Sequence, residues 1–98
     1  MPLTSKQKQH LRGLGHHLNA VVLVGNAGVT DAVIAKIVVE LNNHELIKVK
    51  VHEGAEDVRA VAPILAERTK SEVVQTIGKI AVLYKRRKEK PEIELPRE

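Results

Sequence analysis

An apolar run that ends at a glycine and is followed by a helix start constrains the fold more than any other part of the chain. Val21 to Val24 is typical of a buried strand, and it leads directly into Gly25. After Gly28, the Thr30 hydroxyl can cap a helix, and Asp31 stands in its first turn, where a carboxylate complements the helix dipole. We therefore expect a strand buried on both faces, a four-residue loop and a helix, which is how βαβ units begin.

Three helices are predicted from apolar residues that recur at helical spacing. The first begins at a capping box of Thr4 and Gln7 and ends near His16. The third begins after Glu56 and contains Pro63, which lacks an N–H and predicts a kink or a second helix start. The stripes expected to face the core are Leu11, Leu14 and Leu18 in the first helix, Val33, Ile34, Ile37, Val38 and Leu41 in the second, and Val58, Val61, Ala62 and Leu65 in the third.

Three further segments read as strands. Residues 47–51 alternate between apolar side chains and lysines, which indicates a strand with one wet face. Val73 to Ile77 and Ile80 to Tyr84 flank Gly78-Lys79, a plausible tight hairpin turn. The order α-β-α-β-α-β-β predicts an α/β domain with a four-stranded mixed sheet covered by helices. Right-handed crossovers predict parallel pairing among the first three strands and an antiparallel fourth.

Composition limits the class of protein. The chain has 98 residues, enough for one domain over residues 1–88, followed by a polar and loosely ordered tail over 89–98. It has no cysteine and no run of apolar residues long enough for a membrane span, and its N-terminus lacks a secretory segment. We expect a monomeric cytoplasmic protein. Tyr84 is the single aromatic residue, which disfavours recognition by base stacking.

Positive charge is segregated along the sequence. The formal net charge is +4, and the sequence pI is about 9.6, which favours an anionic partner. Residues 1–24 and 79–88 contain lysines and arginines without any acid, whereas residues 51–72 contain more acids than bases. Such runs are also common on ordinary solvated surfaces, and that interpretation stays open here.

The Gly25-Asn26-Ala27-Gly28 loop is a candidate phosphate site. Free N–H groups and the positive end of a helix dipole meet at such a position, and glycines allow positive φ and close approach of a phosphate backbone. Taken alone, the tetrapeptide more often marks an ordinary turn. Nucleotide loops are disfavoured, because Val29-Thr30 stands where a Walker loop has its Lys-Ser/Thr pair, and the third glycine of a dinucleotide fingerprint is missing.

Neither metal binding nor catalysis is indicated by the remaining polar residues. His16 and His17 are adjacent and diverge on a helix, and His10 has no acid or cysteine near it in sequence. Ser5 and Ser71 belong to no recognisable nucleophile motif. We expect no metal, no cofactor, no small-molecule substrate and no enzymatic activity.

Four ordered segments carry a resemblance that covers nearly the whole chain. They are residues 5–18 (SKQKQHLRGLGHHL), 21–28 (VVLVGNAG), 44–51 (HELIKVKV) and 75–85 (QTIGKIAVLYK). Together they resemble the YhbY family, the stand-alone bacterial members of the CRM domain (chloroplast RNA splicing and ribosome maturation). Residues 51–55 and Pro63 depart most from the family pattern, which affects the boundary of the third helix but not the loop.

The resemblance implies a fold like the C-terminal domain of translation initiation factor 3, a KH-like GxxG loop that contacts RNA, and association with precursors of the large ribosomal subunit. Carried over to this sequence, the RNA-binding residues are Gly25, Asn26, Ala27 and Gly28 with the basic residues Lys6, Lys8, Arg12, Lys48, Lys50 and Lys85.

Three hypotheses follow. The first is an RNA-binding assembly factor for the large ribosomal subunit. The second is a protein-interaction adaptor on ribosomal particles, whose basic surface meets an acidic partner. The third is a small nucleotide-dependent enzyme, against which the absence of a Walker lysine already counts.

Overall fold

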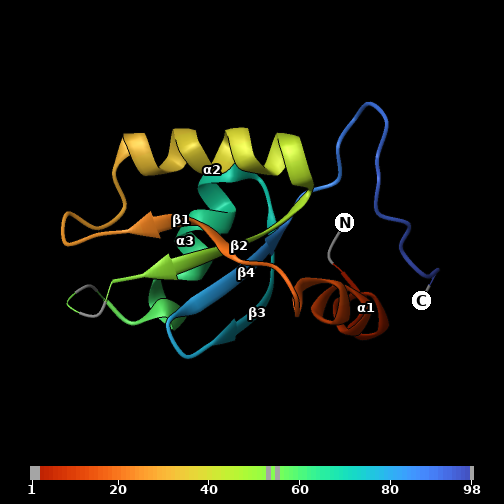
Figure 1. Ribbon diagram of the computed structural model, residues 1–98, viewed down its shortest axis with the longest axis horizontal. Coiled ribbons are helices and arrows are strands. Elements are labelled where there is room, and N and C mark those ends of the chain that lie inside the picture. The colour runs from red at the N-terminus through yellow and green to blue at the C-terminus, as the bar shows by residue number, and fades with distance from the viewer. Residues whose placement is uncertain (1–2, 53, 55, 98) are drawn as a thin grey trace.

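The computed structural model describes residues 3–52, 54 and 56–97, so Glu53 and Ala55 of the divergent 51–55 stretch lie outside the described residues. It contains three helices and four strands in the predicted order (Figure 1). Their bounds are α1 (Ser5–Gly15), β1 (Ala20–Val24), α2 (Asp31–His44), β2 (Leu46–Val51), α3 (Val58–Thr69), β3 (Glu72–Ile77) and β4 (Ile80–Tyr84). None of the helices in the described residues is both long and apolar enough to cross a membrane.

The four strands form one mixed sheet in the order β1-β2-β4-β3. β1 and β2 pair in parallel, and β4 pairs antiparallel with both β2 and β3. The expected parallel pairing among the first three strands was therefore wrong for β3, which pairs only with β4. The reason is the two-residue hairpin turn at Gly78 (φ 58°) and Lys79, which places β3 beside β4, while the other edge of β4 pairs with β2.

Each face of the sheet has its own apolar cluster. α2 and α3 pack on one face, around side chains that include Ile37, Val49 and Leu65. α1 packs on the opposite face and covers only part of it, with Leu11 inserted among Leu46, Val74, Val82 and Tyr84. Figure 1 shows the consequence for shape: α1 and the C-terminal segment lie at one end of the molecule, and the loop between β1 and α2 lies at the other.

β1 is an edge strand, contrary to the expectation that both of its faces are buried. Val22 and Val24 point into the larger cluster, whereas Leu23 is 55% exposed on the opposite face. The error arose because an all-apolar run of this length is typical of a central strand, and the sequence does not show that α1 stops short of it.

Two of the predicted stripes are narrower than expected. Leu14 is 44% exposed, and Leu18 is exposed because it lies beyond the end of α1, where helical spacing no longer applies. On α2, Ile37 and Leu41 are buried, but Val38 is exposed.

Pro63 lies inside one continuous helix, so the expected second helix start was wrong. Pro63 is in the second turn of α3, and its missing N–H deprives only the Arg59 carbonyl of a helical partner. The capping box at Thr4 and Gln7 is confirmed, with the two reciprocal bonds at 3.0 and 3.1 Å.

The Thr30 cap holds the first turn of α2 next to the candidate loop. Its hydroxyl accepts a hydrogen bond from the Val33 N–H at 3.2 Å. Thr30→Ala is expected to lower the free energy of unfolding by about 1 kcal/mol in urea denaturation, because a helix N–H loses its partner. Thr30→Ser, which keeps the hydroxyl, should retain most of that stability, and equal losses in the two variants would contradict the capping role.

Candidate nucleic-acid interface

The loop from Gly25 to Gly28 is a closed turn with half-buried glycines that have open space beside them. The Gly28 N–H donates to the Gly25 carbonyl at 3.0 Å, and Gly28 adopts φ 75°. A Cβ built on Gly25 or Gly28 would meet no other atom within 4 Å. The backbone conformation, and not crowding, therefore favours glycine at position 28. Gly25 does not have a positive φ.

The loop stands at the N-terminus of α2, as the sequence predicted, beside a hollow of about 430 Å³. The hollow is lined by Val24, Asn26, Ala27, Gly28, Val29, Gly54, Glu56, Val61 and Ile64. Within the described part of the chain, its one charged lining residue is Glu56. The Asp31 carboxylate, at the start of α2, forms an ion pair with Arg68 at 2.9 Å. Backbone N–H groups and the helix dipole are thus the attraction for an anion here, and the cations must come from neighbouring elements.

Lys48 and Lys50 supply positive charge on β2, between the loop and α1. They alternate with buried residues and point to the face on which α1 packs. The Lys48 ammonium reaches the His16 carbonyl at the end of α1 at 3.5 Å, and Lys50 pairs in register with Leu23 of β1. Lys48 and Lys50 therefore place positive charge between the GxxG loop and the end of α1.

The other predicted cations lie farther from the loop. Lys6, Lys8 and Arg12 are on α1, and Lys85 follows β4, so all four are at the end of the molecule opposite the loop (Figure 1). On α1, helical spacing places Lys8 and Arg12 on one flank and Leu14 on the other. The structure therefore spreads the predicted site residues along the molecule and does not gather them in one cluster.

A row of side chains across the sheet completes this surface. The strand register aligns Leu23, Lys50, Ile80 and Ile77 in neighbouring positions, and Leu23 and Ile77 are exposed. Sequence reasoning missed this row, because it depends on β4 lying between β2 and β3.

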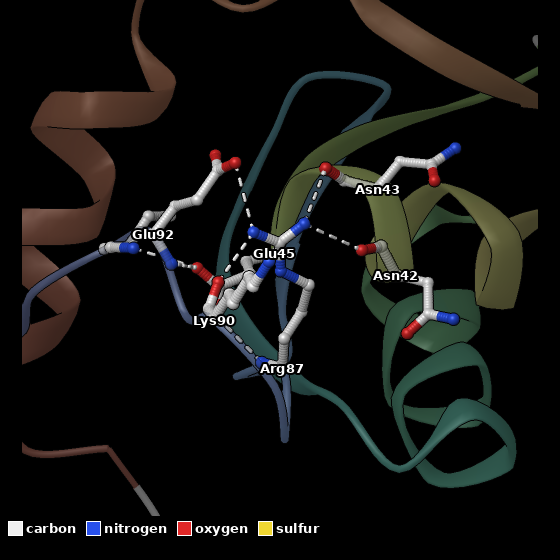
Figure 2. Close-up of polar contacts among 7 residues, drawn as sticks. Asn42, Asn43, Glu45, Arg87, Lys90 and Glu92 are labelled. Atoms are coloured by element: carbon white, nitrogen blue, oxygen red, sulfur yellow. Dashed lines mark hydrogen bonds and ion pairs between the residues drawn. The ribbon is translucent and has the colours of Figure 1, made fainter.

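Sequence reasoning also missed Glu45, which is fully buried at the end of α2. Its carboxylate accepts three backbone hydrogen bonds from the C-terminal segment: Oε2 from Arg87 at 2.8 Å, and Oε1 from Glu92 at 2.7 Å and Ile93 at 2.8 Å (Figure 2). Burial raises the pKa of Glu45, but these three N–H donors and the nearby Arg87 lower it more, so the group stays ionised. A charged residue directly before an apolar strand needs a partner if it is buried, but the sequence shows neither that Glu45 is buried nor which groups bind it.

Glu45 also adopts φ 61°, a region that non-glycine residues rarely occupy. Its N–H donates to the Leu41 carbonyl and its own carbonyl accepts from Lys85, both at 2.8 Å. The main chain and the side chain of Glu45 therefore both fix the segment that follows β4.

Arg87 forms the second half of this network. Its guanidinium donates to the carbonyls of Asn42 and Asn43 at the C-terminus of α2 and to the carbonyl of Lys90, and it pairs with the Glu92 carboxylate at 3.1 Å (Figure 2). After Tyr84 the described chain contains no helix or strand, yet residues 87–93 are tied to α2, and Gln7 of α1 donates to the Pro96 carbonyl. That residues 89–98 are loosely ordered is a statement about their motion, and it stays a prediction.

Near the loop, Asp57 caps α3 and pairs with Arg59 at 2.9 Å. The side-chain and backbone hydrogen bonds from Arg59 lower the pKa of Asp57 to about 2. In the described residues, no three histidine or acidic side chains lie close enough together to hold a metal ion.

An open GxxG loop beside a lysine-bearing sheet face is compatible with contact to a nucleic-acid backbone, as made by the GXXG loop of KH domains. The family model of the CRS1/YhbY (CRM) domain matches residues 3–85, and the chain belongs to this family.

Two bacterial relatives and one solved structure have almost the same length as this chain. A Haemophilus influenzae protein named "RNA-binding protein" is 52% identical over 97% of this chain and 96% of its own length. The Bacillus subtilis "Probable RNA-binding protein YqeI" is 47% identical over 96% of this chain and 99% of its own. The solution structure of a Staphylococcus aureus protein, itself proposed to bind RNA, superposes with a TM-score of 0.84 at 43% identity, covering 96% of this chain and 99% of that one.

Proposed function

We propose that this protein binds RNA through its phosphate backbone, along a surface that runs from the GxxG loop over Lys48 and Lys50 of β2 to α1. The observation that carries the proposal is the open loop: Gly28 holds φ 75° at the start of a capped helix, with nothing in front of it. The names of the relatives and the CRM family support RNA as the ligand.

Backbone contact is favoured over base stacking. Tyr84, the one aromatic residue of the chain, is buried and offers no platform for a base. The exposed side chains of the row beside the loop are aliphatic or lysine, so they can contact ribose and base edges weakly while lysines bind phosphates. Affinity should therefore come from ion pairs and depend little on sequence.

The RNA we propose is that of the large ribosomal subunit before its maturation, with the protein acting in the cytoplasm as a non-enzymatic assembly factor. This step rests on the family resemblance. The alternative is an adaptor that uses the same basic surface to hold an acidic protein on the particle.

Salt titration tests the proposal. If about five phosphates are neutralised, log K for structured ribosomal RNA should fall against log salt with a slope near −4. Filter binding between low and moderate salt measures it. Binding that is independent of salt would overturn backbone recognition. The adaptor is distinguished by charge reversal at Lys8 and Arg12, because loss of retention on ribosomal particles with unchanged affinity for protein-free ribosomal RNA would favour an acidic protein partner.

A further inference from the structure

Two hollows lie at the end of the molecule opposite the GxxG loop, and both are lined by cations. One, of about 340 Å³, is lined by Val38, Leu41 and Asn42 of α2 and by residues 85–89. The other, of about 600 Å³, is lined by Leu3, Thr4, Gln7, Lys70, Glu72, Tyr84, Lys85, Arg86, Leu95 and Arg97. Lys85 and Arg86 line both hollows and form the ridge between them.

Positive charge exceeds negative charge at this end. The cations that line the hollows are Lys70, Lys85, Arg86, Arg87, Lys88 and Arg97, and the carboxylates are Glu72 and Glu89. Arg87 is paired with Glu92, which leaves five cations against two acids.

The segment that carries these cations is held in place by hydrogen bonds to Glu45. Glu45 binds the backbone N–H groups of Arg87, Glu92 and Ile93, and its carbonyl accepts from Lys85. Arg86 and Lys88 on either side of Arg87 are exposed. Internal contacts thus use Arg87 and leave its two neighbours free for a ligand, at positions fixed by a buried carboxylate.

We infer that Lys85, Arg86 and Lys88 form a second phosphate-binding site for RNA and that Glu45 is its positioning residue. The inference rests on the proposed RNA-binding function and adds a second point of contact to it. The GxxG loop and this site stand at the N- and C-terminal ends of α2, whose 14 residues span about 21 Å. An RNA that reaches both sites must therefore lie along the molecule. A short oligonucleotide bound at the loop alone would not reach the second site.

RNA is favoured over an acidic protein by the composition of the hollows. Stable protein interfaces are centred on buried apolar and aromatic anchors. Here the exposed lining of the smaller hollow is mainly polar, and it consists of Asn42, Arg86, Lys88 and Glu89 with Val38 as its exposed large apolar residue. Flexible cations around a concave surface match a run of phosphates.

The first test removes two of the ligand-facing cations. Arg86→Ala combined with Lys88→Ala should weaken binding of structured ribosomal RNA by about tenfold at low salt and reduce the steepness of the salt dependence by about 1 to 2. Lys36→Ala with Lys79→Ala is the matched control, because it removes the same charge from exposed positions on α2 and in the hairpin turn between β3 and β4. An equal loss in both pairs, or no loss in the first, would overturn the site.

The second test uses Glu45→Gln, for which overall charge and positioning predict opposite results. The substitution makes the protein more positive, so a purely electrostatic account predicts tighter binding of RNA. The Gln amide cannot accept hydrogen bonds from all three N–H groups, and its NH₂ must face at least one of them. The positioning role therefore predicts weaker binding, approaching that of the Arg86→Ala/Lys88→Ala pair. Tighter binding would overturn the role of Glu45.

A double-mutant cycle separates positioning from general damage to the fold. In the Arg86→Ala/Lys88→Ala background, Glu45→Gln should cause a much smaller further loss of RNA affinity, because two of the three cations that it positions are already absent. A further loss of the same size would show that Glu45 acts elsewhere. If Glu45→Gln fails to fold by circular dichroism, the paired surface variant still decides the site.

Failure of this inference can be told apart from failure of the proposed function. If Gly28→Asp lowers RNA affinity and the Arg86→Ala/Lys88→Ala pair does not, the loop binds RNA and the second site is wrong. If neither changes RNA affinity, the proposed function is wrong as well. If the pair leaves RNA affinity unchanged but abolishes retention on ribosomal particles, the basic end binds a protein, which also overturns the second site.

Discussion

Replacing Gly28 with aspartate is expected to lower the affinity for ribosomal RNA by about 100-fold, from added strain and charge repulsion. Gly28 holds φ 75°, which costs a residue with a Cβ roughly 1–2 kcal/mol. The new carboxylate would also stand at the position where we place a phosphate. Because no atom lies within 4 Å of the added Cβ, the domain should stay folded, and filter binding together with circular dichroism measures both results.

Gly78→Asp is the matched control for this experiment. Gly78 also has a positive φ and open space for a Cβ, and the substitution adds the same charge at the hairpin turn between β3 and β4. It should destabilise the protein to a similar extent and change RNA affinity much less. Equal losses of affinity in the two variants would mean that net charge and not the GxxG loop determines binding.

Ile37→Ala is expected to have the largest effect on stability, lowering the free energy of unfolding by about 3 kcal/mol. Ile37 is fully buried where α2 packs on the sheet, and truncation leaves a cavity that the surrounding side chains fill only in part. For a domain of this size the melting temperature should fall by at least about 10 °C, which calorimetry measures.

Val39 offers the control on the same helix. It is 55% exposed, so Val39→Ala should change the free energy of unfolding by no more than about 0.5 kcal/mol. A large loss of stability at Val39, or a small one at Ile37, would contradict the orientation of α2, which turns Ile37 toward the core and Val39 toward solvent. RNA affinity measured below the melting temperature should be unchanged in both variants.

Local signals in the sequence predicted most of the fold. The capping box at Thr4, the cap at Thr30 and the Gly78-Lys79 turn each act within a few residues, and each has the predicted element next to it. The order of the strands is not determined by such local signals, because it depends on which edge of the β3–β4 hairpin meets β2. Nothing in residues 72–84 distinguishes a fourth strand added outside β3 from one inserted between β2 and β3, so the pairing of β3 was predicted incorrectly.

The same distinction between local signals and long-range contacts applies to the candidate site. The GxxG loop was predicted because a local pattern marks it, whereas Lys48 and Lys50 of β2 were predicted from the family resemblance. Glu45 was missed because its partners are backbone groups about 42 to 48 residues away, and backbone donors leave no mark in a sequence. The basic run over residues 79–88 was recognised and Lys85 was predicted to bind RNA, but the sequence did not show that Lys70 and Arg97 line the same hollow.

The central position of β4 has a consequence for synthesis of the protein. Lys48 and Lys50 lie on a strand whose second neighbour, residues 80–84, is the last strand to leave the ribosome. Until then β2 has only β1 as a partner, and a two-stranded sheet is at best marginally stable in water. The nascent chain should therefore acquire its binding surface in one late step, after β4 has been made, so that an incomplete chain presents no formed site to the RNA around it.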